Sequence, residues 1–138
     1  MITLNEQDTY VSSVFIEASF DTVWDQVTNQ PNFPELYPAW TTKVEKVDDN
    51  TYHGTGPGGD EFVIRPELNQ TFGIVDFTVE ADQDVEQSRS RLFDVDENIC
   101  IFVHLAVRWN ENGDKQWEAH KHGTNDDLER MKRLFESM

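Results

Sequence analysis

The chain has 138 residues, of which 37% are hydrophobic and sixteen are aromatic (nine Phe, four Trp and three Tyr). This length and apolar content predict one globular domain over residues 1–138, with a packed core rather than disorder. The net charge of −16 would repel phosphate backbones and anionic lipid surfaces, so nucleic acid is not an expected partner.

Three features bear on where the protein works. No apolar run approaches the ~20 residues that a membrane span needs, and the opening MITLNEQDTY lacks the basic and apolar regions of a signal peptide. Cys100 is the one cysteine, which excludes an internal disulfide and favours a reducing compartment. We therefore expect a cytoplasmic protein without stable membrane insertion, whose acidic surface serves either solubility or a saline habitat.

A strand followed directly by a helix is predicted near the beginning of the chain. Residues 10–18 alternate, and Tyr10, Val14 and Ile16 share the even face that we expect to point inward. Ser19 has a hydroxyl that can cap a helix. Apolar residues then recur at helical spacing: Phe20, Val23, Trp24 and Val27. The serine is predicted to join the two elements without an intervening loop.

A proline-rich aromatic segment follows this helix. Pro31, Pro34 and Pro38 prevent a long helix, because each removes a backbone donor and fixes φ. We expect at most a short helical turn around Pro34–Tyr37, with Asn32 as a possible cap.

Six strand-like runs come next, separated by turn signals. They are residues 42–48, 51–54, 61–68, 72–81, 87–95 and 99–109. Short adjacent strands with tight turns predict an antiparallel meander. In the last run the odd positions form the apolar face: Ile99, Ile101, Val103, Leu105, Val107 and Trp109. If that face packs on the core, His104 on the opposite face points away from the interior.

The C-terminal segment is predicted to be the helix that covers this sheet. Its apolar stripe contains Leu128, Met131, Leu134 and Phe135, and Trp117 falls at the same phase. Gly123 interrupts the pattern, which leaves two alternatives open. Either one helix runs from Asp114 through Gly123, or the helix breaks there and Asn125 caps a new one.

The order of these elements resembles the START/Bet v 1-like (SRPBCC) superfamily, including its polyketide cyclase/dehydrase-type and coenzyme Q-binding members. The resemblance is carried by Ile16 and Ala18, the pair Val23-Trp24, the prolines at 31, 34 and 38, and the closing DLERMKRLFE. It implies an α+β helix-grip fold: a curved seven-stranded antiparallel sheet around a long C-terminal helix, with two short helices after strand 1. It also implies a cavity that takes apolar molecules such as lipids, quinones or polyketides.

Six residues are candidates for ligand binding: Phe33, Tyr37, Trp40, Arg91, Trp117 and His120. The resemblance implies that the aromatic positions surround the cavity entrance, where aromatic walls suit a large apolar ligand; alternatively, they fill a small core. His120 is the candidate for acid–base catalysis, and an exposed surface histidine is the alternative. Arg91 either pairs on the outer sheet face or points inward toward an acidic head group.

Neither a cofactor nor a metal site is expected. His120 and His122 are two residues apart, which puts them on different faces of a helix, and no Cys or further His lies at ligand spacing. The glycine-rich GTGPGGDE at residues 54–61 lacks the ending of a phosphate-binding loop and leads into a strand, so it predicts a wide hairpin turn.

Two functions from different classes stay open, with a third behind them. The first is binding or carriage of an apolar small molecule by a monomer or homodimer. The second is an enzyme of cyclase, dehydratase or hydrolase type acting on such a ligand. The third is a protein-interaction module, like the chaperone-activator branch of the superfamily. An apolar cavity of at least ~300 Å³ favours the first two, and a histidine inside it hydrogen-bonded to a carboxylate favours the enzyme.

Overall fold

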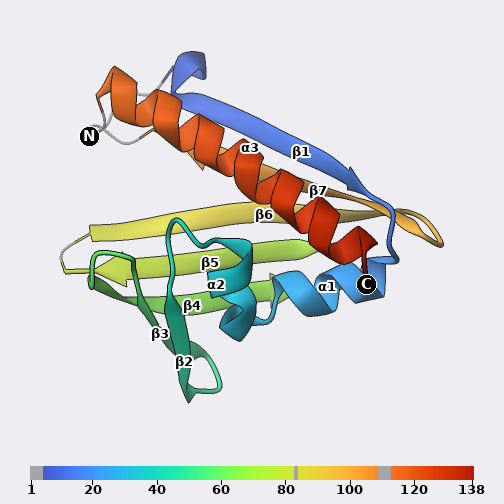
Figure 1. Ribbon diagram of the computed structural model, residues 1–138, viewed down its shortest axis with the longest axis horizontal. Helices are drawn as coiled ribbons and strands as arrows, with labels where there is room; N and C mark the ends of the chain where they lie inside the picture. Colours follow the sequence, from blue (N-terminus) through green and yellow to red (C-terminus); the bar gives the residue numbers. More distant parts are fainter. Residues whose placement is uncertain (1–4, 83, 109–112) are drawn as a thin grey trace.

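The structure is a computed structural model that describes residues 5–82, 84–108 and 113–138. Within these residues seven strands form one antiparallel sheet in the order β1-β7-β6-β5-β4-β3-β2 (Figure 1). The strands are β1 (Thr9–Ile16), β2 (Lys43–Asp48), β3 (Thr51–Thr55), β4 (Glu61–Asn69), β5 (Ile74–Ala81), β6 (Asp84–Asp96) and β7 (Ile99–Val107). The helices are η1 (Glu6–Asp8), α1 (Phe20–Val27), η2 (Gln30–Asn32), α2 (Phe33–Leu36) and α3 (Asp114–Glu136).

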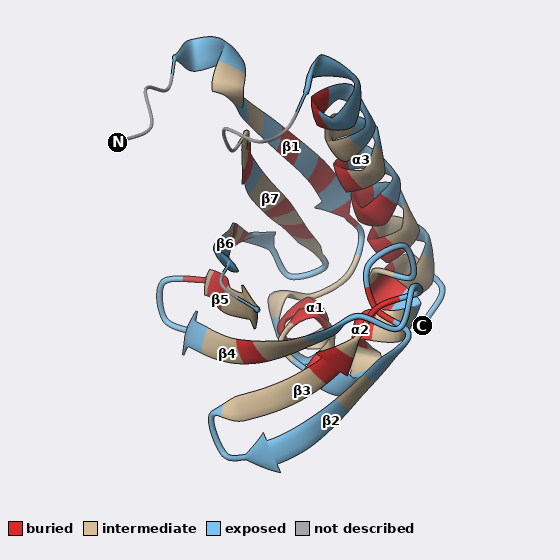
Figure 2. Cartoon of the chain, turned by 90° about the vertical axis from the view of Figure 1, so that its left-hand side faces the viewer, coloured by how far each residue is buried: buried red, intermediate tan, exposed pale blue. Residues whose placement is uncertain are grey.

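The sheet bends around the long helix α3. Figure 2 shows β1 and β7 standing beside α3, while β2, β3 and β4 curve round below α1 and α2. The main packing partner of α3 is β1. This arrangement is the α+β helix-grip architecture expected from the order of elements. Trp109, which the sequence places in the last strand, lies outside the described residues.

The passage from β1 to α1 has the predicted faces and the predicted cap. Val14 and Ile16 are buried on the even face of β1, and the Ser19 hydroxyl accepts a hydrogen bond from the Thr22 amide at 3.2 Å. The strand ends at Ile16, however, so three residues separate it from the helix. The expected direct joint is therefore a short bend.

The proline-rich segment forms two short pieces of helix, η2 and α2, rather than one turn. Asn32 stands in the cap position of α2 but makes no capping hydrogen bond. Its amide nitrogen instead donates to the side-chain oxygen of Gln26 at 3.1 Å. The prolines restrict each piece to its first turn, as expected. The ring of Phe33 packs against the sheet, edge-on to the ring of Phe77, with 5.0 Å between the ring centroids.

The inward face of β7 is the opposite of the one predicted. Register with β1 places Ile16 opposite Cys100, Val14 opposite Phe102 and Ser12 opposite His104. Directly opposite residues of an antiparallel pair share a face, so the buried even face of β1 fixes the even face of β7 as the inner one. The odd, apolar positions face outward, and Leu105 is 36% exposed. The prediction that His104 points away from the interior is therefore wrong.

Helix α3 is continuous through Gly123, which decides between the two alternatives for this segment. Asn125 caps no new helix; its side chain accepts a hydrogen bond from the Ser12 hydroxyl at 2.6 Å and donates to the Tyr10 hydroxyl at 2.8 Å. These contacts fix the middle of α3 against β1. Trp117 and Met131 are both buried, as the apolar stripe predicts.

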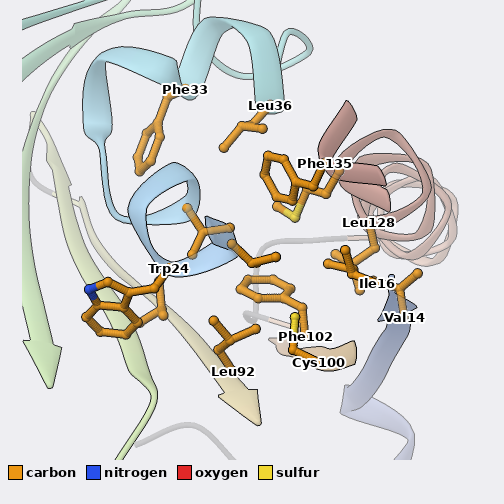
Figure 3. Close-up of a cluster of buried hydrophobic side chains, with 14 of the residues drawn as sticks. Val14, Ile16, Trp24, Phe33, Leu36, Leu92, Cys100, Phe102, Leu128 and Phe135 are labelled. Atoms are coloured by element: carbon orange, nitrogen blue, oxygen red, sulfur yellow. The ribbon is translucent and has the colours of Figure 1, made fainter. Parts of the chain in front are cut away.

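The core lies where α1, α2 and α3 meet the inner face of the sheet. Figure 3 shows Trp24 of α1, Phe33 and Leu36 of α2, and Leu128 and Phe135 of α3 converging over Leu92, Cys100 and Phe102 of the sheet. Trp24 stacks on Phe20 with 6.0 Å between ring centroids. The core fills this end of the grip and leaves the opposite end open.

Candidate functional site

A cavity of about 370 Å³ lies between the inner face of the sheet and the helices α2 and α3. Its apolar walls come from α2 and the residue after it, from β4, β5 and β7, and from α3: Phe33, Tyr37, Phe62, Ile64, Phe77, Val79, Ala81, Phe102, Ala106 and Leu128. The remaining lining residues are Leu105 and Val107 of β7 and a mainly polar set: Trp40, Thr41, Asp60, Asp84, Glu86, Gln87, Ser88, His104, His120, Thr124 and Asp127. The cavity therefore has an apolar interior with polar groups at defined positions, as ligand-binding sites do.

One wall of the cavity depends on a glycine in the neighbouring strand. Gly54 of β3 lies opposite Phe62 of β4 in the register of the sheet. A Cβ atom at position 54 would overlap the Phe62 ring. The absence of a side chain at Gly54 thus lets the ring lie across β3 and form part of the cavity wall.

His104 enters the cavity from β7. Its ring nitrogen Nδ1 shares a hydrogen bond with the Ser90 hydroxyl at 2.8 Å, and Ser90 is buried on β6. Burial, together with the proximity of His120, lowers the pKa of His104 to about 4. The imidazole is therefore neutral at physiological pH, and the serine fixes its orientation.

His120 reaches the same cavity from α3 and is flanked by two tryptophans. Its ring centroid is 5.6 Å from that of Trp40 and 5.6 Å from that of Trp117. Burial lowers the pKa of His120, and the nearby carboxylate of Glu86 opposes that shift. The imidazole thus links the loop that carries Trp40 to the first turns of α3.

A buried carboxylate lies deeper along the same face of α3. Asp127 pairs with Arg130 at 2.7 Å, and the same Arg130 nitrogen donates to the Leu36 carbonyl at 3.1 Å. Burial raises the pKa of Asp127, while Arg130 and a hydrogen bond with Trp40 oppose the shift. Burial also raises the pKa of the Tyr37 hydroxyl, and the charge of Asp127 adds to that effect. Tyr37 is therefore a neutral hydrogen-bonding group.

Three further carboxylates line the open end of the cavity. Asp60 lies in the turn between β3 and β4, and Asp84 and Glu86 lie at the start of β6. All three residues are exposed. Among the described lining residues there is neither a lysine nor an arginine. The lining is thus acidic at its mouth and apolar inside.

The structure brings four of the six candidate residues together and separates two. Phe33, Tyr37, Trp40 and His120 line the cavity. Trp117 is buried behind His120, and its indole N–H donates to the Gln7 carbonyl at 3.2 Å. Arg91 lies on the outer face of β6, where it donates to Asp76 at 2.8 Å. The inward orientation considered for Arg91 is not found.

The sequence interpretation missed His104 and the acidic lining residues. His104 was assigned to the wrong face of its strand, and the signal that finds it is the pairing of β7 with β1. Asp127 follows Thr124 and His120 along one side of α3 at helical spacing, a polar stripe beside the apolar one. Glu86 has no local signature, because its position at the mouth depends on the curvature of the sheet.

A second hollow and the cysteine are weaker candidates for a functional site. A shallow hollow lies between the start of α1 and the turn after β6, lined by Ser19, Phe20, Asp21 and residues 94–97, and it lacks an apolar interior. Burial, with the charge of Asp94, raises the pKa of the Cys100 thiol to about 11, so this cysteine is not an activated nucleophile.

The described residues contain neither a metal-binding cluster nor a membrane-spanning helix. No group of three or more His, Cys, Asp or Glu side chains is placed to hold a metal ion in the part of the chain that the structure covers. Across the same residues, every helix is too short or too polar to pass through a lipid bilayer.

Comparisons with known proteins give matches in structure alone. No family model and no curated protein matches the sequence. An uncharacterised protein from Bacillus thuringiensis superposes with a TM-score of 0.73 at 14% identity, covering 92% of this chain and 98% of that one. The Zhui aromatase/cyclase from Streptomyces sp. R1128 gives 0.69 at 17% identity, covering 93% of each chain.

A START superfamily protein from Mycobacterium smegmatis gives a TM-score of 0.63 at 11% identity, covering 94% of each chain. Each match extends over nearly the whole of both chains, so it includes the sheet, the short helices and α3. At these identities the matches establish the architecture alone. The chain has the START/Bet v 1-like (SRPBCC) fold.

Proposed function

We propose that this protein binds an apolar small molecule in the cavity between its sheet and α3. The observation that carries the proposal is the cavity of about 370 Å³, which falls within the range of small-molecule sites. A chain of this size closes its core at one end with α1 and α2 and could have filled the other end. It instead keeps sheltered apolar space beside a short row of polar groups.

Burial of apolar surface would supply most of the affinity. Removing about 200 Å² of apolar ligand surface from water contributes roughly 5 kcal/mol before the costs of association. Phe33, Phe77 and Phe102 offer rigid aromatic surfaces for this contact. The half-exposed Trp40, at 48% exposure, stands where a ligand would enter.

The hydrogen bonding of the cavity histidines supports binding over catalysis. His104 bonds to the hydroxyl of Ser90 rather than to a carboxylate, and His120 has tryptophan rings as its neighbours. A carboxylate that orients a histidine base is the usual sign of acid–base catalysis. The two imidazoles are better placed to offer hydrogen bonds to a ligand.

The solved structures with this fold add support of a general kind. One is called an aromatase/cyclase and another a START superfamily protein. An internal cavity of the kind described here is compatible with a lipid, quinone or polyketide-like ligand. Of these, we propose the general class, an apolar molecule with a small polar part.

The test is occupancy of the cavity. Native mass spectrometry of protein purified from its own host should show a co-purifying apolar molecule, and a neutral dye such as Nile red should bind at one site. Filling the cavity with Val79→Trp, or nearer the mouth with Ala81→Trp, should weaken dye binding at least about tenfold. Val79 and Ala81 both line the cavity.

Val63→Trp is the matched control, because Val63 lies on the outer face of β4, opposite Glu80. It should leave dye affinity within about twofold of the parent protein. Circular dichroism would establish that each variant is folded. Dye binding that survives both filling variants, or that responds equally to Val63→Trp, would place the ligand elsewhere.

A further inference from the structure

We propose that the cavity admits neutral or cationic apolar molecules and excludes anionic ones, with the polar end of the ligand beside His104 and His120. This inference rests on the proposed function and specifies its ligand class. It follows from the charges that line the space, taken together with what each charged group already contacts.

The lining contains four carboxylates and, among its described residues, no basic side chain to balance them. Asp60, Asp84 and Glu86 surround the mouth, and Asp127 lies within. Arg130, the cation that contacts Asp127, is already paired with that carboxylate and with the Leu36 carbonyl. An anionic head group would therefore meet like charges without a partner, which is unfavourable in a partly desolvated site.

The two histidines do not supply the missing positive charge. His104 is partly buried, and burial together with the neighbouring imidazole holds its pKa near 4; burial also lowers the pKa of His120. At neutral pH both rings are uncharged. A neutral imidazole offers one donor and one acceptor, which suits a hydroxyl, carbonyl or amine.

The mouth is also suited to a positive charge. The Trp40 ring is half exposed beside His120, and an aromatic face attracts cations. Together with Asp60, Asp84 and Glu86, it forms a boundary at which an ammonium group gains favourable contacts. A neutral polar group meets neither penalty nor gain there.

The overall charge of −16 acts in the same direction and must be separated from the local effect. Long-range repulsion between exposed charges is screened at physiological salt, with a Debye length of about 8 Å. The mouth carboxylates line the cavity itself, and the charge of Glu86 already acts on the pKa of His120, whereas most other surface charges lie away from the lining. If the mouth carboxylates cause the exclusion of anions, the affinity for an anionic ligand should respond to substitutions at those few residues only.

The test uses three ligands of equal chain length that differ in head group: decanol, decylamine and decanoate. Each is titrated against Nile red bound to the intact protein, at neutral pH and below its micelle concentration. Decanoate should bind at least about tenfold more weakly than decanol, and decylamine should bind at least as tightly as decanol. Nile red and decanol are neutral, so they report on the cavity itself.

A mouth variant and a surface variant separate local from overall charge. The mouth variant combines Asp60→Asn, Asp84→Asn and Glu86→Gln. It should reduce the ratio of decanol affinity to decanoate affinity to about threefold or less. The surface variant is Asp25→Asn, Asp49→Asn and Glu129→Gln combined, at exposed positions away from the cavity lining. It removes the same amount of charge and should leave the ratio of decanol affinity to decanoate affinity unchanged.

The possible failures are distinct. Decanoate binding as tightly as decanol to the parent protein would overturn the inference while leaving the proposed function intact. If the difference between decanol and decanoate affinity shrank equally in the mouth and surface variants, the discrimination would not come from the carboxylates at the mouth. Absence of both Nile red and decanol binding would overturn the proposed function, and the inference with it. The titrations of the parent protein decide the main point even where the mouth variant does not fold.

Discussion

Ser90 Oγ and His104 Nδ1 lie 2.8 Å apart, directly across the neighbouring strands β6 and β7. Ser90 is only 5% exposed, so Ser90→Ala would leave a partly buried ring nitrogen without its partner. We expect a loss of about 1–3 kcal/mol in the free energy of unfolding, measured by urea denaturation. Ser13→Ala, at an exposed position of β1, is the control and should change it little. Equal stability of Ser90→Ala and the parent protein would contradict the role given to this contact.

The pH dependence of stability should carry a contribution from His104. Its pKa lies near 4 in the folded protein, below the ordinary 6.5. Between these values the unfolded chain binds a proton that the folded one does not, so stability falls as the pH is lowered through this window. The slope due to one such group is at most about 1.4 kcal/mol per pH unit.

Comparison of variants isolates this contribution from that of other groups. Asp127, whose pKa is raised by burial, acts in the opposite direction and is common to all variants. His104→Asn should show a shallower fall in stability between about pH 6.5 and pH 5 than the parent protein. His122→Asn, at an exposed position of α3, should keep the parent slope. Identical slopes for all three proteins would contradict the burial of a neutral His104.

Truncation of Trp24 tests the placement of α1. The side chain is 8% exposed and stacks on Phe20, so Trp24→Ala should cost about 3–5 kcal/mol. Phe72→Ala removes an aromatic ring that is 72% exposed and should lower the melting temperature far less. Trp24 does not line the cavity, and dye binding well below the melting temperature should therefore persist. An unchanged melting temperature would show that α1 is misplaced.

Two glycines should respond in opposite ways to alanine. Gly73 has φ of +66°, and a Cβ atom there would overlap the Leu92 carbonyl oxygen, so Gly73→Ala should destabilise by more than about 1 kcal/mol. Gly123 lies within α3, where a Cβ atom meets nothing within 4 Å. Gly123→Ala should stabilise by about 0.5–1 kcal/mol, because alanine is the better helix former. Thermal unfolding measures both changes in stability. Changes of the same sign for the two variants would contradict the conformations described for Gly73 and Gly123.

Local patterns were sufficient to predict the main elements of the fold. The Ser19 cap, the stripe of Val23, Trp24 and Val27, and the alternation of β1 are short-range signals, and the structure shows each of them. The bounds of β6 were wrong: the strand starts at Asp84 rather than Gln87. Asp84 and Glu86 have low strand propensity, so pairing with β5 outweighs their local preference.

The candidate site was predicted only in part, for a physical reason. Alternation in β7 separates two faces, but both carry apolar residues, with Phe102 and Ala106 on one and Ile101 and Leu105 on the other. Which face is buried depends on the register with β1, a partner far away in the sequence. His104 could not be placed without that register.

The place of β1 in the sheet has a consequence for folding. Every other pair of neighbouring strands is consecutive in the chain, whereas β1 pairs with β7, the last strand before α3. During synthesis the hairpins from β2 to β6 can form as they emerge, but β1 must wait for β7. No residue of β1 lines the cavity, but α3, which supplies one wall, packs mainly on β1. We therefore expect the hollow that would receive a ligand to be completed only in this late, high-contact-order step of assembly.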